Sequence, residues 1–204
     1  MLSFHAGAPP AISDDVLAAR AREGGRSAFV ALVERYQDRV YRLALRMSNN
    51  PSDAEEIVQN TFLLAYRSIR SFHGDSRFWT WLYRIAVNSA LMQRRAARRH
   101  PALSLEGMDA ASGGVSASGS EPLQGADELI HRKMLAVRVH EAMARLQASQ
   151  RAALVLCDLE GLSSQDAADV LGVSADVVRQ RAHRARLRLR EQLGDLLRTS
   201  PARC

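Results

Sequence analysis

Proline is confined to six positions of this 204-residue chain: Pro9, Pro10, Pro51, Pro101, Pro122 and Pro201. Three long spans, 11–50, 52–100 and 123–200, therefore lack the residue that most strongly interrupts a helix. Apolar residues in these spans recur every three or four positions, as at Phe29, Leu32 and Tyr36, rather than alternating. This spacing predicts amphipathic helices throughout and an all-α fold.

The charge of the chain divides it into three parts. Residues 1–100 hold 15 basic and 9 acidic side chains, residues 101–127 hold 4 acidic and no basic ones, and residues 128–204 hold 13 basic and 9 acidic ones. The middle part, PALSLEGMDAASGGVSASGSEPLQGAD, is rich in Gly, Ser and Ala, and it cannot bury enough apolar area to offset the entropy of ordering it. We expect two small helical domains, 13–100 and 128–197, joined by a flexible linker, 101–127, with tails at 1–12 and 198–204.

Several classes of protein are disfavoured by composition. No apolar run reaches 18 residues and the N-terminus lacks the pattern of a secretory signal, so we expect a cytoplasmic protein. Cys157 and Cys204 are too few for a disulfide framework or a zinc cage, and the six histidines are scattered. No strand-like segment or catalytic constellation is visible. We expect no enzymatic activity, metal, cofactor or small-molecule substrate.

Helix boundaries can be predicted in the first domain. Ser52 and Glu55 form a capping-box pattern after Pro51, which predicts a helix from about residue 53. We expect its buried stripe to include Ile57, Phe62, Leu64 and Ile69 or close neighbours. Gly74, in SFHGDS, should end this helical segment, and the next helix should run from about residue 78 to about residue 99.

A helix-turn-helix is predicted near the C-terminus, in SSQDAADVLGVSADVVRQRAHRARLRLR. Ser163 and Ser174 are positioned to cap its two helices, and Gly172 to form the turn between them. One stripe of the second helix is apolar and should pack: Val178, Ala182, Ala185 and Leu189. The second helix of such a motif enters the DNA major groove.

The arginines of that second helix are candidate DNA ligands. Arg179, Gln180 and Arg181 are placed to read base edges, and Arg184 and Arg186 to hold phosphates. A solvated basic face is the usual explanation of a charge run, but the turn directly before this helix favours DNA binding.

The first domain concentrates aromatic residues. Seven of the eleven lie between residues 62 and 83: Phe62, Tyr66, Phe72, Phe78, Trp79, Trp81 and Tyr83. Arginines are interleaved with them, and this mixture suits single-stranded nucleic acid, whose bases stack on exposed rings. We expect Phe62 and Phe78 to be buried for packing, and the loop residues to be the better candidates for stacking.

Both halves resemble a known family. The stretch SDAEEIVQNTFLLAYRSIRSFHGDSRFWTWLYRIAVNSALMQRR resembles region 2 of extracytoplasmic-function (ECF) sigma factors, and LQASQRAALVLCDLEGLSSQDAADVLGVSADVVRQRAHRARLRLREQL resembles their region 4. The resemblance covers about residues 13–100 and 128–195. It implies a bacterial transcription initiation factor that reads the −35 promoter element as duplex with region 4 and opens the −10 element with region 2. It also implies three partners: core RNA polymerase (clamp coiled coil and flap), promoter DNA, and an anti-sigma factor that controls a stress response. Bound to the anti-sigma factor, the otherwise cytoplasmic protein would be held at the inner membrane.

The resemblance also implies roles for individual residues. Those implied for −35 binding are Ser174, Arg179, Gln180, Arg181, His183, Arg184 and Arg186. Those implied for −10 binding are Tyr66, Arg67, Phe72, His73, Trp81, Arg84, Ile85 and Asn88. The resemblance also implies that a flipped base enters a pocket beside SFHGDS and that Asn88 lines this pocket. Those implied for polymerase docking are Asp53, Glu56, Gln59 and Asn60. The sequence departs from the family at Asn60, more often Glu, and at Gln180, more often Ser, and the second change suggests a −35 preference of its own.

Two other classes compete with this interpretation. A stand-alone helix-turn-helix regulator would need a dimerisation or ligand-binding domain, and it would leave the aromatic and basic cluster without a role. A serine recombinase would need a catalytic domain with parallel strands, and the sequence predicts none. We therefore rank the stand-alone regulator second.

Overall fold

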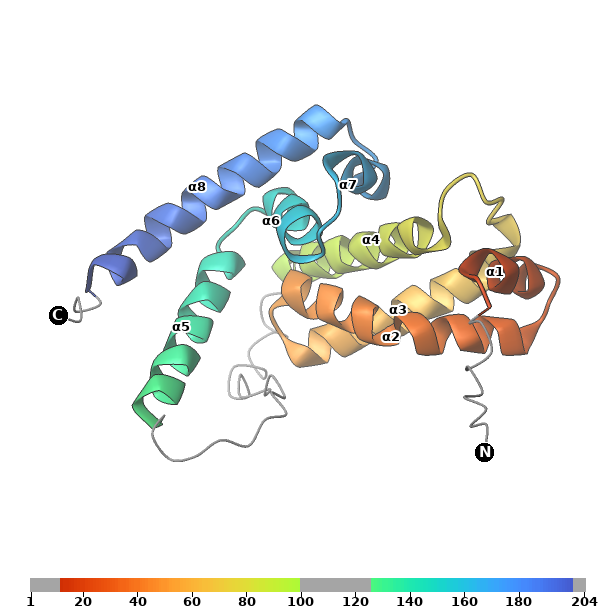
Figure 1. Cartoon of the computed structure of the whole chain (residues 1–204), viewed down its shortest axis with the longest axis horizontal. Coiled ribbons are helices and arrows are strands. Elements are labelled where there is room, and N and C mark those ends of the chain that lie inside the picture. The colour runs from red at the N-terminus through yellow and green to blue at the C-terminus, as the bar shows by residue number, and fades with distance from the viewer. Residues whose placement is uncertain (1–11, 100–125, 200–204) are drawn as a thin grey trace, which may run out of the picture.

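A computed structural model describes residues 12–99 and 126–199 (Figure 1). Every regular element in these two ranges is helical, which confirms the all-α prediction. The first bundle contains α1 (Asp14–Arg22), α2 (Arg26–Ser48), α3 (Pro51–Ser68), a short 3₁₀ turn η1 (Ile69–Ser71) and α4 (Phe78–Arg99). The second contains α5 (Ala126–Ala144), α6 (Ala148–Leu154), a π-helical turn η4 (Val155–Leu159), α7 (Ser164–Leu171) and α8 (Ala175–Thr199). Most of the predicted linker lies outside the described residues, and its last two positions begin α5.

The first bundle is built around α2. Its apolar residues at three- and four-residue spacing, among them Leu32, Val40 and Leu43, are almost completely buried against α3 and α4. On α3 the buried stripe is made of Ala54, Ile57, Thr61 and Ala65. The predicted stripe is confirmed at Ile57 and Ile69, whereas Leu64 is exposed and its neighbour Ala65 is buried in its place.

Side-chain caps fix the helix ends. Asn50, not Ser52, caps α3: its side-chain oxygen accepts a hydrogen bond of 2.9 Å from the Ser52 amide, and Pro51 occupies the first helical position. The capping-box prediction was therefore wrong by two residues. The predicted limits of the following helix, 78 and 99, are confirmed.

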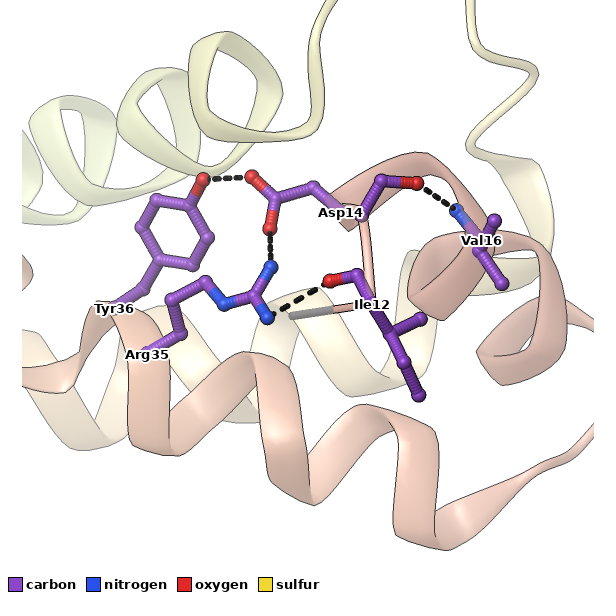
Figure 2. A network of polar contacts seen from close by, with 6 residues as sticks. Ile12, Asp14, Val16, Arg35 and Tyr36 are labelled. Carbon is purple, nitrogen blue, oxygen red and sulfur yellow. Dashed lines mark hydrogen bonds and ion pairs between the residues drawn. The ribbon is translucent and has the colours of Figure 1, made fainter. Parts of the chain in front are cut away.

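The start of α1 is tied to α2 by a polar network (Figure 2). Arg35 and the Tyr36 hydroxyl both donate hydrogen bonds to the Asp14 carboxylate, and Arg35 Nη2 also donates to the Ile12 carbonyl at 2.9 Å. Burial, then the contact with Asp14, raises the pKa of Tyr36 far above its usual range. Ile12, which we assigned to the N-terminal tail, is thus held against the bundle.

The two bundles lie against each other, with α7 on α4 and α6 beside the end of α2 (Figure 1). Arg151, on α6, is 1% exposed, and its Nη1 donates to the Met47 carbonyl at 3.0 Å while its Nη2 donates to the side chain of Asn49. Asn49 has a left-handed backbone (φ 76°), and its side-chain amide donates a hydrogen bond to the His140 carbonyl at 3.1 Å. Burial, and secondarily Arg94, lowers the pKa of Arg151 to about 10.

Candidate nucleic-acid interface

The predicted turn between α7 and α8 is present. Ser163 caps α7 by accepting a 3.1 Å hydrogen bond from the Asp166 amide, and Gly172 ends the helix in the left-handed conformation (φ 64°). The Ser174 hydroxyl accepts from the Val177 amide at 3.4 Å, at the start of α8. Ala168 and Val178 are buried where the two helices cross. The local geometry is that of a helix-turn-helix.

One face of α8 is buried and the rest is open. Val178, Ala182 and Ala185 are at most 2% exposed and Leu189 is half-buried, as the predicted stripe requires. The candidate −35 residues are exposed, apart from half-buried Arg181: Ser174, Arg179, Gln180, His183, Arg184 and Arg186. The candidate residues for base edges and for phosphates are therefore accessible on α8 and at its start.

Two of these arginines have acidic partners within the chain. Arg179 pairs with Asp176, one turn earlier on α8. Arg186 makes a bidentate contact with Asp158 of η4, at 2.8 and 2.6 Å, and this contact raises the pKa of Arg186. Arg186 must exchange a carboxylate for a phosphate before it can bind DNA, whereas Arg184 has no such partner among the described residues.

The aromatic cluster is more buried than predicted. Phe72 is 6% exposed, and its ring contacts those of Phe78 and Trp81 at centroid distances of 5.8 and 5.2 Å. We expected Phe72 to offer a stacking surface, but the extended backbone after η1 turns it into the core. Phe78 is buried as predicted, whereas Phe62 is only half-buried. Tyr66, at 52% exposed, is the ring best presented to solvent.

A pocket lies beside the loop SFHGDS. It has a volume of about 460 Å³, and α1 forms one wall and the loop the other. Arg22, Phe72, Gly74 and Arg77 are among its lining residues, and Gly74 adopts φ 82°, which favours glycine. Asn88, which the resemblance placed in this pocket, lies exposed on α4 and is not among the residues that line it.

The other candidate −10 residues differ in accessibility. Arg67 and His73 are exposed, and Trp81 and Ile85 are half-buried. Arg84 is exposed, but its Nε donates to the Asp169 carbonyl of α7 at 3.1 Å. One candidate DNA ligand of the first bundle is thus engaged by the helix-turn-helix.

The candidate polymerase-docking residues form an acidic and amide face on α3. Glu56, Gln59 and Asn60 are exposed and Asp53 is half-buried. Gln93 of α4 donates to Glu56 at 2.7 Å and to Asp53 at 3.5 Å, so both carboxylates are held by one amide. Burial, and next the charge of Glu56, raises the pKa of Asp53.

Sequence reasoning missed the residues that join the two bundles. Glu160 accepts a hydrogen bond from the Tyr83 hydroxyl at 3.2 Å and forms an ion pair with Arg46. Burial, then Glu160, raises the pKa of Tyr83 to about 12. Arg151 directly precedes an apolar run, AALVLC, and this position is the only signal in the sequence that could have suggested its burial.

In ranges 12–99 and 126–199, no group of His, Cys, Asp and Glu could hold a metal ion. None of the described helices has the length and apolar character needed to cross a bilayer.

Comparison with known proteins gave matches over both bundles. The family described as Sigma-70 region 2 matches residues 32–100, and the family described as Sigma-70, region 4 matches residues 136–189. The RNA polymerase sigma-H factor of Pseudomonas aeruginosa is 34% identical over 185 residues, which cover 91% of this chain and 96% of that protein. The ECF RNA polymerase sigma-E factor of Escherichia coli K12 is 36% identical over 191 residues, which cover 92% of this chain and 97% of that protein. Among solved structures, the sigma factor RpoE of Bartonella quintana, in complex with the anti-sigma factor NepR, superposes with a TM-score of 0.62 at 26% identity, over 81% of this chain and 96% of that one.

Proposed function

The chain belongs to the sigma-70 family, as a sigma factor of the ECF type, and we propose that it binds core RNA polymerase and directs it to promoters. In this proposal region 4, residues 128–197, reads the −35 element as duplex through α8. Region 2, residues 13–100, docks on the polymerase through the α3 face and takes up the −10 element as a melted strand. The proposal places the protein in the cytoplasm and assigns it no reaction of its own.

One observation carries this proposal: a basic helix face and a separate concave pocket occur on a single chain. The open face of α8 has the form that enters a major groove, with Gln180 and Arg184 both exposed. The pocket beside SFHGDS is concave, and its lining includes two arginines, Arg22 and Arg77, and two carboxylates, Asp15 and Asp75, so its charges balance and it suits an unpaired base rather than a phosphate. A stand-alone regulator has use for the first surface only.

The acidic face of α3 supports the polymerase contact. Glu56, Gln59 and Asn60 project from consecutive turns of one rigid helix, and Gln93 orients Glu56. A half-buried carboxylate such as Asp53, whose burial raises its pKa, is costly to keep ionised, and a partner surface of opposite charge would offset that cost.

Transcription in vitro tests the proposal. The purified chain is added to bacterial core polymerase with a library of genomic fragments, and the transcript ends are sequenced. We expect a stable complex and initiation at a set of fragments that share two elements. Binding to DNA without polymerase, with no new transcripts, would instead support the stand-alone regulator.

We further propose that an anti-sigma factor binds this chain, because the similar Bartonella structure contains one. Affinity purification of the tagged chain from its own cells, followed by mass spectrometry, should recover both core polymerase and a second protein in separate complexes. The second protein, added to the transcription assay, should abolish initiation.

A further inference from the structure

A second pocket on region 2, at the turn between α1 and α2, is basic. It has a volume of about 280 Å³, and its lining includes Gly24, Gly25, Arg26, Tyr66, Arg67 and Arg70. Tyr66 and Arg67 are candidate −10 residues, whereas Arg26 and Arg70 have no role in the proposal above. The pocket thus brings the start of α2 to the end of α3.

Within residues 12–99 and 126–199, the three arginines of this pocket have no acidic partner. Arg35, Arg46, Arg179 and Arg186 each pair with a carboxylate, but among the described residues no carboxylate pairs with Arg26, Arg67 or Arg70. Three like charges around one small concavity repel one another unless an anion lies between them. Guanidinium groups bind the oxygens of a phosphate in bidentate fashion, so phosphate chemistry fits this lining.

The glycine turn fixes one wall of the pocket. Gly24 has φ 96°, and a Cβ on Gly25 would lie 2.7 Å from the Arg20 carbonyl oxygen, to which the Gly25 amide donates at 2.9 Å. Glycine is favoured at Gly24 by the backbone conformation and at Gly25 by the close Arg20 carbonyl, and the open space at Gly24 leaves that part of the wall accessible to a ligand.

An aromatic ring stands at the same pocket. Tyr66 is 52% exposed, and its ring meets that of Phe29 edge-on, with a centroid distance of 5.1 Å and an angle of 67°. This contact holds the tyrosine ring while much of its surface stays open to solvent. A base can stack there while its phosphate meets the arginines.

This pocket adjoins the one beside SFHGDS. Ala21 lines one pocket and Arg22 the other, and Arg70 and Phe72 are divided between them in the same way. A strand with one base in the loop pocket therefore passes directly to the arginines. We propose that the pocket binds a phosphodiester of the single strand through Arg26, Arg67 and Arg70, with a neighbouring base on Tyr66. This inference rests on the proposed function and adds Arg26 and Arg70 to the strand-binding residues.

Single-strand affinity of the full chain tests the inference. The probe is a fluorescein-labelled, mixed-sequence single-stranded oligodeoxynucleotide of about 12 nucleotides, within the range that single-strand-binding folds cover. Its anisotropy is measured over a series of salt concentrations for Arg26→Ala, Arg70→Ala and Arg42→Ala. Arg42 is the matched control, because it is exposed on the same helix and lies about 24 Å further along it.

Arg26→Ala and Arg70→Ala should each weaken binding several-fold and reduce the slope of log K against log salt by about 0.7. Arg42→Ala should behave as the wild type, and duplex binding through α8 should be unchanged in all three. Equal affinities for the three variants would overturn the inference. Loss of inorganic pyrophosphate binding in Arg26→Ala or Arg70→Ala, with single-strand binding unchanged, would also overturn the inference, since the site would then hold a free anion. If either result came with normal promoter-specific transcription, the proposed function would stand while the pocket assignment fell.

Discussion

Asp53, a residue of the proposed docking face, has a cost to stability. Its carboxylate is half-buried beside Glu56, and burial is the main cause of its raised pKa. A carboxyl group with a raised pKa in the folded state stabilises the fold below its unfolded pKa of about 4, and that contribution is lost as the pH rises through the folded pKa. At neutral pH the ionised Asp53 therefore lowers the free energy of unfolding.

Asp53→Asn should accordingly unfold at a higher urea concentration than the wild type at pH 7, and the difference should close as the pH falls towards 4. The amide can still accept the hydrogen bond from Gln93. The same variant should bind core polymerase more weakly, because a charge of the docking face is lost. Asp38→Asn, at an exposed position of α2, is the control. A less stable Asp53→Asn at pH 7 would mean that the attraction between Asp53 and the N-terminus of α3 exceeds the cost of its burial.

At the scale of the helix, the proposed function assigns sequence reading and phosphate binding to different residues of α8. Gln180→Ala should change the preferred base in a randomised −35 library, since an amide that reads a base edge contributes about 1–3 kcal/mol of discrimination. Arg184→Ala should weaken binding to all DNA sequences alike and should reduce the slope of log K against log salt by about 0.9. Arg190→Ala removes the same charge from an exposed position further along α8 and controls for net charge. An unchanged base preference in Gln180→Ala would place the reading face elsewhere on the helix.

Elements with a strong local signal could be predicted from the sequence. The turn at Gly172, the packed stripe of α8 and the limits of α4 follow from capping, glycine and apolar spacing, all of which are local. Phe72 and Leu64 could not be placed, because their burial depends on how α1, α3 and α4 meet in space. The same holds for the arginine pocket, since Arg26 and Arg70 are 44 positions apart and are brought together only by the bundle.

At the scale of the whole molecule, the structure shows the two regions in contact. Arg84 donates to the Asp169 carbonyl, so it can reach a DNA strand only when α7 moves away from α4. Several of the contacts that oppose this movement are polar: Arg151 with Met47 and Asn49, Asn49 with His140, and Glu160 with Arg46 and Tyr83. Apolar residues of both bundles also belong to one buried cluster. Polar contacts can exchange for water when the regions part, which makes separation less costly than exposing an apolar core.

Asn49→Gly tests this packing without disturbing the helix that carries it. Asn49 has a left-handed backbone, which glycine adopts without strain, so the end of α2 should stay intact. The variant loses its side-chain hydrogen bonds to Arg151 and His140 and leaves a buried guanidinium without one of its acceptors, which costs about 1–3 kcal/mol. We expect a larger radius of gyration by small-angle X-ray scattering at unchanged helical content, together with tighter binding of single-stranded DNA as Arg84 becomes free.

Arg151→Ala should have the same effect from the other side of the contact. The double variant should be no more open than the more open single variant, because both changes break the same hydrogen bond. Arg145→Ala, at an exposed arginine of the second bundle, should leave the scattering unchanged. Scattering identical to the wild type in both Asn49→Gly and Arg151→Ala would show that apolar contacts between α4 and α7 hold the regions together.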